Sequence, residues 1–111
     1  MLGLSYVKAF YPPVNANVDE NAVVVAAAGS LPSELHKHWR AKQVGGYHLE
    51  YGYSCMGYEI CGGVGVKLAC PERDVVVMVG DGSYMMMNSD IATAVSMGLK
   101  LTIVVLDNRG F

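Results

Sequence analysis

The sequence predicts an α/β fold in which helices flank an open, mostly parallel sheet. Two apolar runs carry this prediction, because Val75–Val79 and Leu101–Leu106 are each the length of a buried strand. The stretch between them has apolar residues at helical spacing, so strand, glycine loop, helix and strand form a βαβ unit. Ala22–Ala28 predicts a further strand of the same kind. Strands of a parallel sheet are buried on both faces, which explains why these runs are unbroken.

Turn and capping signals predict the remaining elements. Ser33 is expected to cap a short helix through Arg40, with basic residues near the end of the helix, where they suit its dipole. Residues 48–53 read as a short extended stretch. A glycine-rich helix is expected from about residue 54 to residue 69, where Pro71 ends it.

Helix capping also bounds the helix of the βαβ unit. We expect Asn88 or Ser89 to begin this helix and Gly98 to end it. Its inward positions are predicted to be Ile91, Ala94 and Val95. The helix therefore follows the glycine loop rather than starting inside it.

Two segments are predicted along the chain. Residues 1–21 read as a linker or part of a preceding segment, because Tyr11-Pro12-Pro13 is expected to break any early helix. Residues 22–111 are predicted to form one domain, truncated at its C-terminal end. The last predicted strand has no following helix and would be left partly uncovered, so we expect the chain to be a fragment of a longer polypeptide.

Composition narrows the class of protein. Of the 111 residues, 52% are hydrophobic and only 16% are charged, which predicts that another domain or subunit buries part of the surface. A formal net charge of −2 gives no basic surface for nucleic acid. No apolar run reaches the about 18–20 residues of a membrane span, and residues 1–10 lack a signal pattern, so we expect a cytoplasmic protein with no membrane partner.

Polar side chains follow two of the predicted strands. Gly80-Asp81-Gly82-Ser83 comes directly after one strand, and Asp107-Asn108 follows the other. The carboxylate of Asp81 and the amide oxygen of Asn108 are hard donors that suit Mg²⁺ beside a phosphate group. Each motif taken singly is common turn chemistry. A non-catalytic α/β assembly module, in which both residues merely cap turns, therefore stays open as an alternative.

These motifs resemble the diphosphate- and metal-binding motif of the thiamine diphosphate enzymes, which begins Gly-Asp-Gly and closes with Asn. The resemblance implies the thiamine diphosphate-binding fold, here its diphosphate-binding domain. It also implies Mg²⁺ ligands at Asp81, Asn108 and the carbonyl of Gly110, and cofactor contacts at Gly82, Ser83 and Asn108. Many family members have Asn-Asn where this chain has Asp107-Asn108, so the second ligand rests on Asn108 alone.

A second block of residues matches the same family. Met56 stands at the distance before Asp81 where these enzymes carry a bulky apolar residue that supports the bent cofactor. The resemblance implies that main-chain groups around Ser54 and Met56 hold the aminopyrimidine ring, and that Gly29-Ser30 is the other diphosphate-contacting loop. The alternative for Met56 is that it is the first core residue of an amphipathic helix.

Longer phrases narrow the resemblance to the acetohydroxyacid-synthase-like branch. They include Ala-Ala-Gly-Ser-Leu-Pro, Glu-Tyr-Gly-Tyr-Ser-Cys-Met-Gly-Tyr-Glu and Gly-Asp-Gly-Ser-Tyr-Met-Met-Met-Asn-Ser. Within that branch they imply hydrolytic ring opening of a cyclic 1,2-dione in inositol catabolism, with an acetolactate synthase-like carboligase or decarboxylase as the alternative.

The family pattern also implies what this chain lacks. Activation of the cofactor in these enzymes needs a Glu from another domain, and none of the five Glu residues in this chain matches it. We therefore expect no catalytic residue in the chain, no turnover by the chain alone, and a homodimer or homotetramer of a longer protein.

Overall fold

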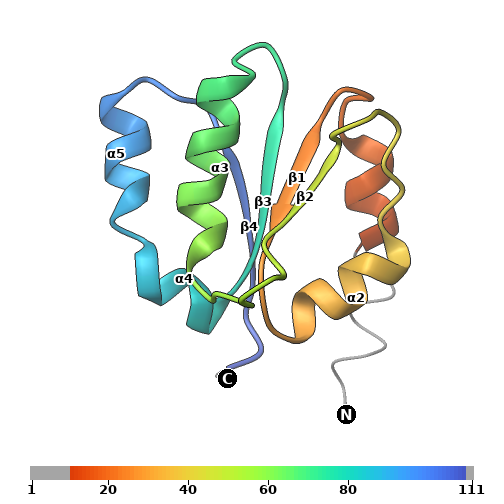
Figure 1. Cartoon of the computed structure of the whole chain (residues 1–111), viewed down its shortest axis with the longest axis horizontal. Coiled ribbons are helices and arrows are strands. Elements are labelled where there is room, and N and C mark those ends of the chain that lie inside the picture. The colour runs from red at the N-terminus through yellow and green to blue at the C-terminus, as the bar shows by residue number, and fades with distance from the viewer. Residues whose placement is uncertain (1–10, 110–111) are drawn as a thin grey trace.

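The computed structural model describes residues 11–109, which form a sheet with helices on both faces (Figure 1). The strands are β1 (Val23–Ala26), β2 (Tyr47–Leu49), β3 (Val75–Gly80) and β4 (Thr102–Leu106). They are all parallel and lie in the order β2-β1-β3-β4. The main helices are α2 (Ser30–His38), α3 (Tyr58–Ala69), α4 (Asp81–Met87) and α5 (Asp90–Ser96). The predicted α/β class with an open parallel sheet is confirmed.

The core lies on both faces of the sheet, because successive strand residues point in opposite directions. On one face, the alternate residues of β1 and β3 pack with residues of α2 and its C-terminal end: Val24, Ala26, Val76, Met78, Leu31, Leu35 and Trp39. The intervening strand residues face α3 and form a second cluster: Val23, Val25, Val75, Val77, Val79 and Ile60. Burial on both faces explains the unbroken apolar runs of β1 and β3.

The connections of β1 and β3 leave the sheet on opposite faces. The chain passes from β1 into α2 on one face and from β3 into α4 on the other, as Figure 1 shows. These two strands are neighbours, so the sheet has a topological switch point between them. In open parallel sheets, the crevice that binds ligands lies at such a point, beyond the carboxyl ends of the strands.

Residues 11–17 are helical, so the expectation that Tyr11-Pro12-Pro13 breaks an early helix is wrong. Proline is well suited to the start of a helix, where the missing N–H would have no partner within the helix. Tyr11 is fully buried in the cluster beside α2, and the Asn15 side chain exchanges two hydrogen bonds with the backbone of Arg40. This helix therefore packs against the domain. The boundary at residue 22 stays a prediction, and residues 1–10 lie outside the described part of the chain.

Two predicted helices begin at other residues than expected. Helix α2 starts at Ser30 rather than at Ser33, because Gly29 takes φ 110° and turns the chain directly into the helix. Helix α3 starts at Tyr58 rather than near residue 54, because Gly57 with φ 92° precedes it. Both positive φ angles favour glycine, and each glycine ends a loop at the same edge of the sheet.

Two helices follow β3 where the sequence predicts one. Helix α4 begins at Asp81 immediately after the strand, so the predicted glycine loop is the first turn of a helix. Helix α5 follows, with Ser89 at its N-cap position, and Gly98 with φ 68° follows its C-terminal end as predicted. Of the three predicted inward positions on this helix, Ala94 is buried, whereas Val95 is 72% exposed.

Strand β4 is the least covered strand along its length. Thr102 and Val105 are exposed and the other three residues are half-buried, so the strand is partly uncovered, as predicted. None of the helices within residues 11–109 has the length and apolar character needed to cross a membrane.

Candidate cofactor site at the carboxyl edge of the sheet

The predicted site residues gather at one edge of the sheet. Parallel strands all end at the same edge, so the segments that follow them are neighbours. Gly29 and Ser30 follow β1, and Ser54 and Met56 lie between β2 and α3. Asp81, Gly82 and Ser83 form the first turn of α4, and Asn108 follows β4. Gly110, the third predicted metal ligand, lies outside the described residues.

The two predicted metal-binding side chains follow paired strands. Gly80 of β3 is in register with Leu106 of β4, so Asp81 and the Asp107-Asn108 segment continue from neighbouring strand ends. The Asp107 carboxylate accepts the N–H of Arg109 at 2.8 Å and closes its own turn. This turn occupies Asp107, so the structure is consistent with Asn108 as the second ligand.

The donor types at this edge fit Mg²⁺, which takes oxygen ligands from a few protein groups and from phosphate. No group of three or more His, Cys, Asp or Glu side chains within residues 11–109 has a metal-binding arrangement. The predicted set is of another kind, since it combines one carboxylate, one amide and one main-chain carbonyl.

Gly29 leaves the backbone at the end of β1 open to a ligand. An added Cβ at this position would meet no heavy atom within 4 Å. The main-chain N–H groups at the start of α2 follow directly, and helix N-termini favour anions such as a diphosphate. The Gly29-Ser30 segment therefore has the space and the donors that its predicted role requires.

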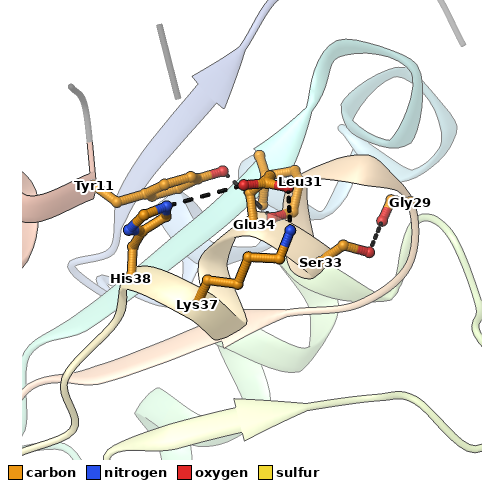
Figure 2. A network of polar contacts seen from close by, with 7 residues as sticks. All are labelled: Tyr11, Gly29, Leu31, Ser33, Glu34, Lys37 and His38. Carbon is orange, nitrogen blue, oxygen red and sulfur yellow. Dashed lines mark hydrogen bonds and ion pairs between the residues drawn. The ribbon is translucent and has the colours of Figure 1, made fainter. Parts of the chain in front are cut away.

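Figure 2 shows the polar contacts that α2 makes with Gly29 and Tyr11 and within itself. The Ser33 hydroxyl donates to the Gly29 carbonyl at 3.4 Å, and the Lys37 ammonium pairs with Glu34 at 2.7 Å. The His38 Nε2 lies 3.9 Å from the other Glu34 oxygen. Burial, followed by the charge of Glu34, raises the pKa of Tyr11. These contacts tie the start of α2 to its own second turn and to the helix at residues 11–17.

The loop from Glu50 to Gly57 has an ordered backbone. The Glu50 carboxylate accepts the N–H groups of Tyr53 at 3.0 Å and Cys55 at 2.6 Å. These hydrogen bonds, that of Cys55 first, lower the pKa of Glu50. Ser54 takes φ 57°, a left-handed conformation that is uncommon for a residue with a side chain. The carboxylate of Glu50 therefore fixes the segment that the resemblance assigns to the aminopyrimidine ring.

Met56 lies in this loop, before α3 begins, and its side chain is 38% exposed. The alternative that Met56 is the first core residue of an amphipathic helix is therefore wrong. A large apolar side chain left accessible at a ligand edge is consistent with the predicted supporting role.

Ser83 is buried and faces the protein interior rather than the crevice. Its hydroxyl donates to Glu59, with Oγ 2.8 and 2.9 Å from the two carboxylate oxygens, and it accepts the N–H of Gly57 at 2.7 Å. The predicted contact of Ser83 with the cofactor would therefore come from its main-chain atoms and not from its hydroxyl. The sequence does not single out Glu59, because an acidic residue in the first turn of a helix is common on protein surfaces.

The three histidines do not form a shared site. His36 stacks on Tyr47 with ring centroids 5.4 Å apart, whereas His38 stacks on Tyr11 at 6.2 Å. The two therefore point to different sides of α2, as their spacing predicts. His48 of β2 lies 2.6 Å from the Tyr58 hydroxyl through Nε2.

A groove of about 570 Å³ runs between α3 and the β2 side of the sheet. It is lined by His48, Tyr58, Cys61, Val66, Cys70 and Arg73 together with Val23 and small residues. None of the predicted cofactor residues lines it, so this groove is separate from the candidate site.

Comparison with known proteins gives the family. Residues 27–111 match the family described as thiamine pyrophosphate enzyme, C-terminal TPP binding domain. The chain is also similar to proteins named 3D-(3,5/4)-trihydroxycyclohexane-1,2-dione hydrolase. Over 98 residues it is 52% identical to that of Geobacillus thermodenitrificans, 49% to that of Shouchella clausii and 48% to that of Bacillus thuringiensis.

Each of these alignments covers 88% of this chain but only 15% of the relative. The chain thus spans about 15% of the length of the curated relatives it matches. The matched segment begins directly after β1 and contains β2, β3, β4 and all of the predicted cofactor residues. The chain therefore belongs to the thiamine pyrophosphate enzymes and carries their C-terminal cofactor-binding domain.

Proposed function

We propose that this chain is the cofactor-binding part of a Mg²⁺-dependent thiamine diphosphate enzyme that hydrolyses trihydroxycyclohexane-1,2-dione in inositol catabolism. The observation that carries the proposal is that the four segments that follow the strands lie at the same carboxyl edge of the sheet, around the switch point between β1 and β3. The names of the similar bacterial proteins support the dione as the substrate.

The residues of this chain would bind and orient the cofactor rather than react. Asp81, Asn108 and the Gly110 carbonyl would hold Mg²⁺, which neutralises the charge of the diphosphate. The backbone at Gly29-Ser30 and at the first turn of α4 would contact the diphosphate, and Met56 would support the thiazolium. When bound, thiamine diphosphate supplies the chemistry of C–C bond cleavage.

Other domains or subunits would complete the site. Large apolar side chains are exposed near the predicted cofactor edge, including Tyr53 at 91% and Met85 at 68%. Such a surface supports burial against another part of the same cytoplasmic protein in a homodimer or homotetramer. The activating Glu would come from there, so the 111-residue chain alone should not turn over.

The experiment uses the full-length protein that contains this chain, loaded with thiamine diphosphate and Mg²⁺. It is supplied in parallel with trihydroxycyclohexane-1,2-dione and with pyruvate. Conversion of the dione to an open-chain deoxy sugar acid is expected, with little consumption of pyruvate. Acetolactate formation without ring opening would favour the carboligase alternative. Dione turnover by the purified 111-residue chain would contradict the need for a second domain.

A further inference from the structure

Glu59 is a carboxylate buried in the interior beside the candidate site. It is only 1% exposed and is the second residue of α3. Removing a carboxylate from water is costly unless hydrogen bonds replace its hydration. Within residues 11–109 no Lys, Arg or His side chain pairs with it, so hydrogen bonds and the N-terminal dipole of α3 compensate its burial.

Two groups, the Ser83 hydroxyl and the Gly57 N–H, donate these hydrogen bonds, and they are also hydrogen-bonded to each other. The Ser83 Oγ lies 2.8 Å from Oε1 and 2.9 Å from Oε2 of Glu59. The N–H of Gly57 is shared between Oε2 of Glu59 at 2.9 Å and Oγ of Ser83 at 2.7 Å. The single hydroxyl proton of Ser83 therefore serves the carboxylate, while its oxygen accepts from the backbone.

Packing reinforces the same junction. A Cβ added to Gly57 would lie 3.1 Å from Met87 Cγ and 3.2 Å from Met86 Cβ. Gly57 also takes φ 92°, which a larger residue adopts only with strain. The start of α3 thus contacts α4 at both ends, since Gly57 packs against the last residues of α4 and Glu59 is hydrogen-bonded to Ser83 in its first turn.

The two segments joined in this way carry different parts of the proposed cofactor site. Gly57 directly follows Met56, in the segment assigned to the aminopyrimidine end. Ser83 shares the first turn of α4 with Asp81, which is assigned to the metal and diphosphate. We propose that Glu59 is a positioning residue that sets the spacing between these two halves of the site. This inference rests on the proposed function.

Glu50 differs from Glu59, because it organises the same loop without contacting α4. Its carboxylate accepts hydrogen bonds from residues of the loop itself, among them the N–H groups of Tyr53 and Cys55. Substitution of Glu50 therefore loosens the loop but leaves the junction between α3 and α4 in place. Only Glu59 is expected to be energetically coupled to Ser83.

The test is a double-mutant cycle on the full-length protein, with Glu59→Gln, Ser83→Ala and the double variant. The dissociation constant of thiamine diphosphate is measured by calorimetry in the presence of Mg²⁺, and amide exchange of residues 53–57 is measured without cofactor. Each single variant should weaken binding about tenfold or more, as loss of a supporting contact does at other sites. The double variant should be no weaker than either single one.

Two further variants serve as controls. Glu72→Gln, at an exposed position just beyond the C-terminal end of α3, should bind as wild type does. Glu50→Gln combined with Ser83→Ala should give additive losses. Amide exchange at Gly57 should rise in Glu59→Gln, because its acceptor is weakened.

Several outcomes would overturn the inference. A folded Glu59→Gln protein that is less stable but binds thiamine diphosphate like wild type would reduce Glu59 to a structural role. Additive losses for Glu59→Gln and Ser83→Ala would remove the coupling. If Glu59→Gln does not fold, Ser83→Ala decides, and wild-type affinity with wild-type exchange at Gly57 would contradict the inference. Absence of binding by the wild type would instead reject the proposed function itself.

Discussion

Gly63 of α3 and Val77 of β3 are in such close contact that a Cβ at position 63 would overlap Cγ2 of Val77. A glycine at this point lets the helix backbone approach the sheet directly. Gly62, one residue earlier, is similarly closed off by the ring of Tyr58. This close approach holds α3 against the sheet and thereby fixes the start of the helix, with Glu59, at the candidate site.

Replacing Gly63 with alanine should destabilise the domain. The added methyl must displace Val77 or the helix, and overpacking of this kind typically costs about 1–3 kcal/mol. Gly65→Ala is the matched control in the same helix, because no heavy atom lies within 4 Å of an added Cβ there. That variant should gain about 0.5–1 kcal/mol from helix propensity. Urea unfolding of both variants measures the difference, and equal stabilities would contradict the contact.

Replacing Tyr11 with phenylalanine should change how stability depends on high pH. Burial, followed by the charges of Glu34 and Tyr47, raises the pKa of Tyr11 in the folded protein. The folded state therefore holds this proton more tightly than the unfolded state does. The resulting stabilisation of the folded protein is complete below pH 10.0 and is lost as the pH rises further. Tyr11→Phe should lose up to about 1 kcal/mol at neutral pH, through its 3.4 Å bond to the Leu31 carbonyl.

The alkaline decline in stability should then be shallower in Tyr11→Phe than in wild type. Thermal unfolding midpoints between pH 8 and pH 11 measure this slope, where ~10 is the ordinary tyrosine pKa. Parallel slopes in the two proteins would show that Tyr11 is not shielded as the structure describes.

Replacing Glu50 with glutamine should affect the loop that carries Ser54 and Met56. Hydrogen bonds from Cys55 and Tyr53 lower the pKa of Glu50 below its ordinary 4.5. The stabilisation that the Glu50 carboxylate gives is therefore present above pH 4.5. It is lost as the pH falls through the lowered pKa of the folded protein. At neutral pH, Glu50→Gln should increase amide exchange at residues 53 and 55. The same amides in wild type should lose protection only in acid, and pH-independent protection would contradict this assignment.

Truncating the Met56 side chain should lower the turnover of the enzyme while leaving the stability of the fold nearly unchanged. The side chain lies in a loop and is 38% exposed, so Met56→Ala should change the free energy of unfolding by less than about 0.5 kcal/mol. Turnover of the full-length enzyme should nevertheless fall by about tenfold to a hundredfold, because the cofactor is held less well in its reactive geometry. Met56→Leu, which keeps the apolar bulk, should retain most of the activity. Equal turnover in both variants would exclude the supporting role.

Much of the fold was readable because the strands are buried on both faces and appear as continuous apolar runs. Asp81 and Asn108 could be predicted to lie at the carboxyl edge of the sheet, because each follows a parallel strand. Helix boundaries were less accurate where a glycine with positive φ decides them, as at Gly29 and Gly57. Backbone conformation of this kind depends on the neighbours that the glycine must avoid, and a local pattern does not contain them.

The buried polar contact between Glu59 and Ser83 could not be predicted from the sequence either. Glu59 reads as an ordinary acidic residue at a helix start, where it suits the dipole. Its burial depends on Ser83, which comes from another element and meets it only through the sheet topology. The helix at residues 11–17 was missed because prolines were interpreted as breakers rather than as starters.

The most direct measurement is calorimetric titration of thiamine diphosphate into the full-length protein, with Mg²⁺ and with excess EDTA. Asp81→Ala is compared with Asp74→Ala, since the two residues flank opposite ends of β3 and Asp74 is exposed at the far edge. We expect Mg²⁺-dependent binding in wild type and Asp74→Ala, and its loss in Asp81→Ala. Wild-type binding in a folded Asp81→Ala protein, or binding that is indifferent to EDTA, would contradict this expectation.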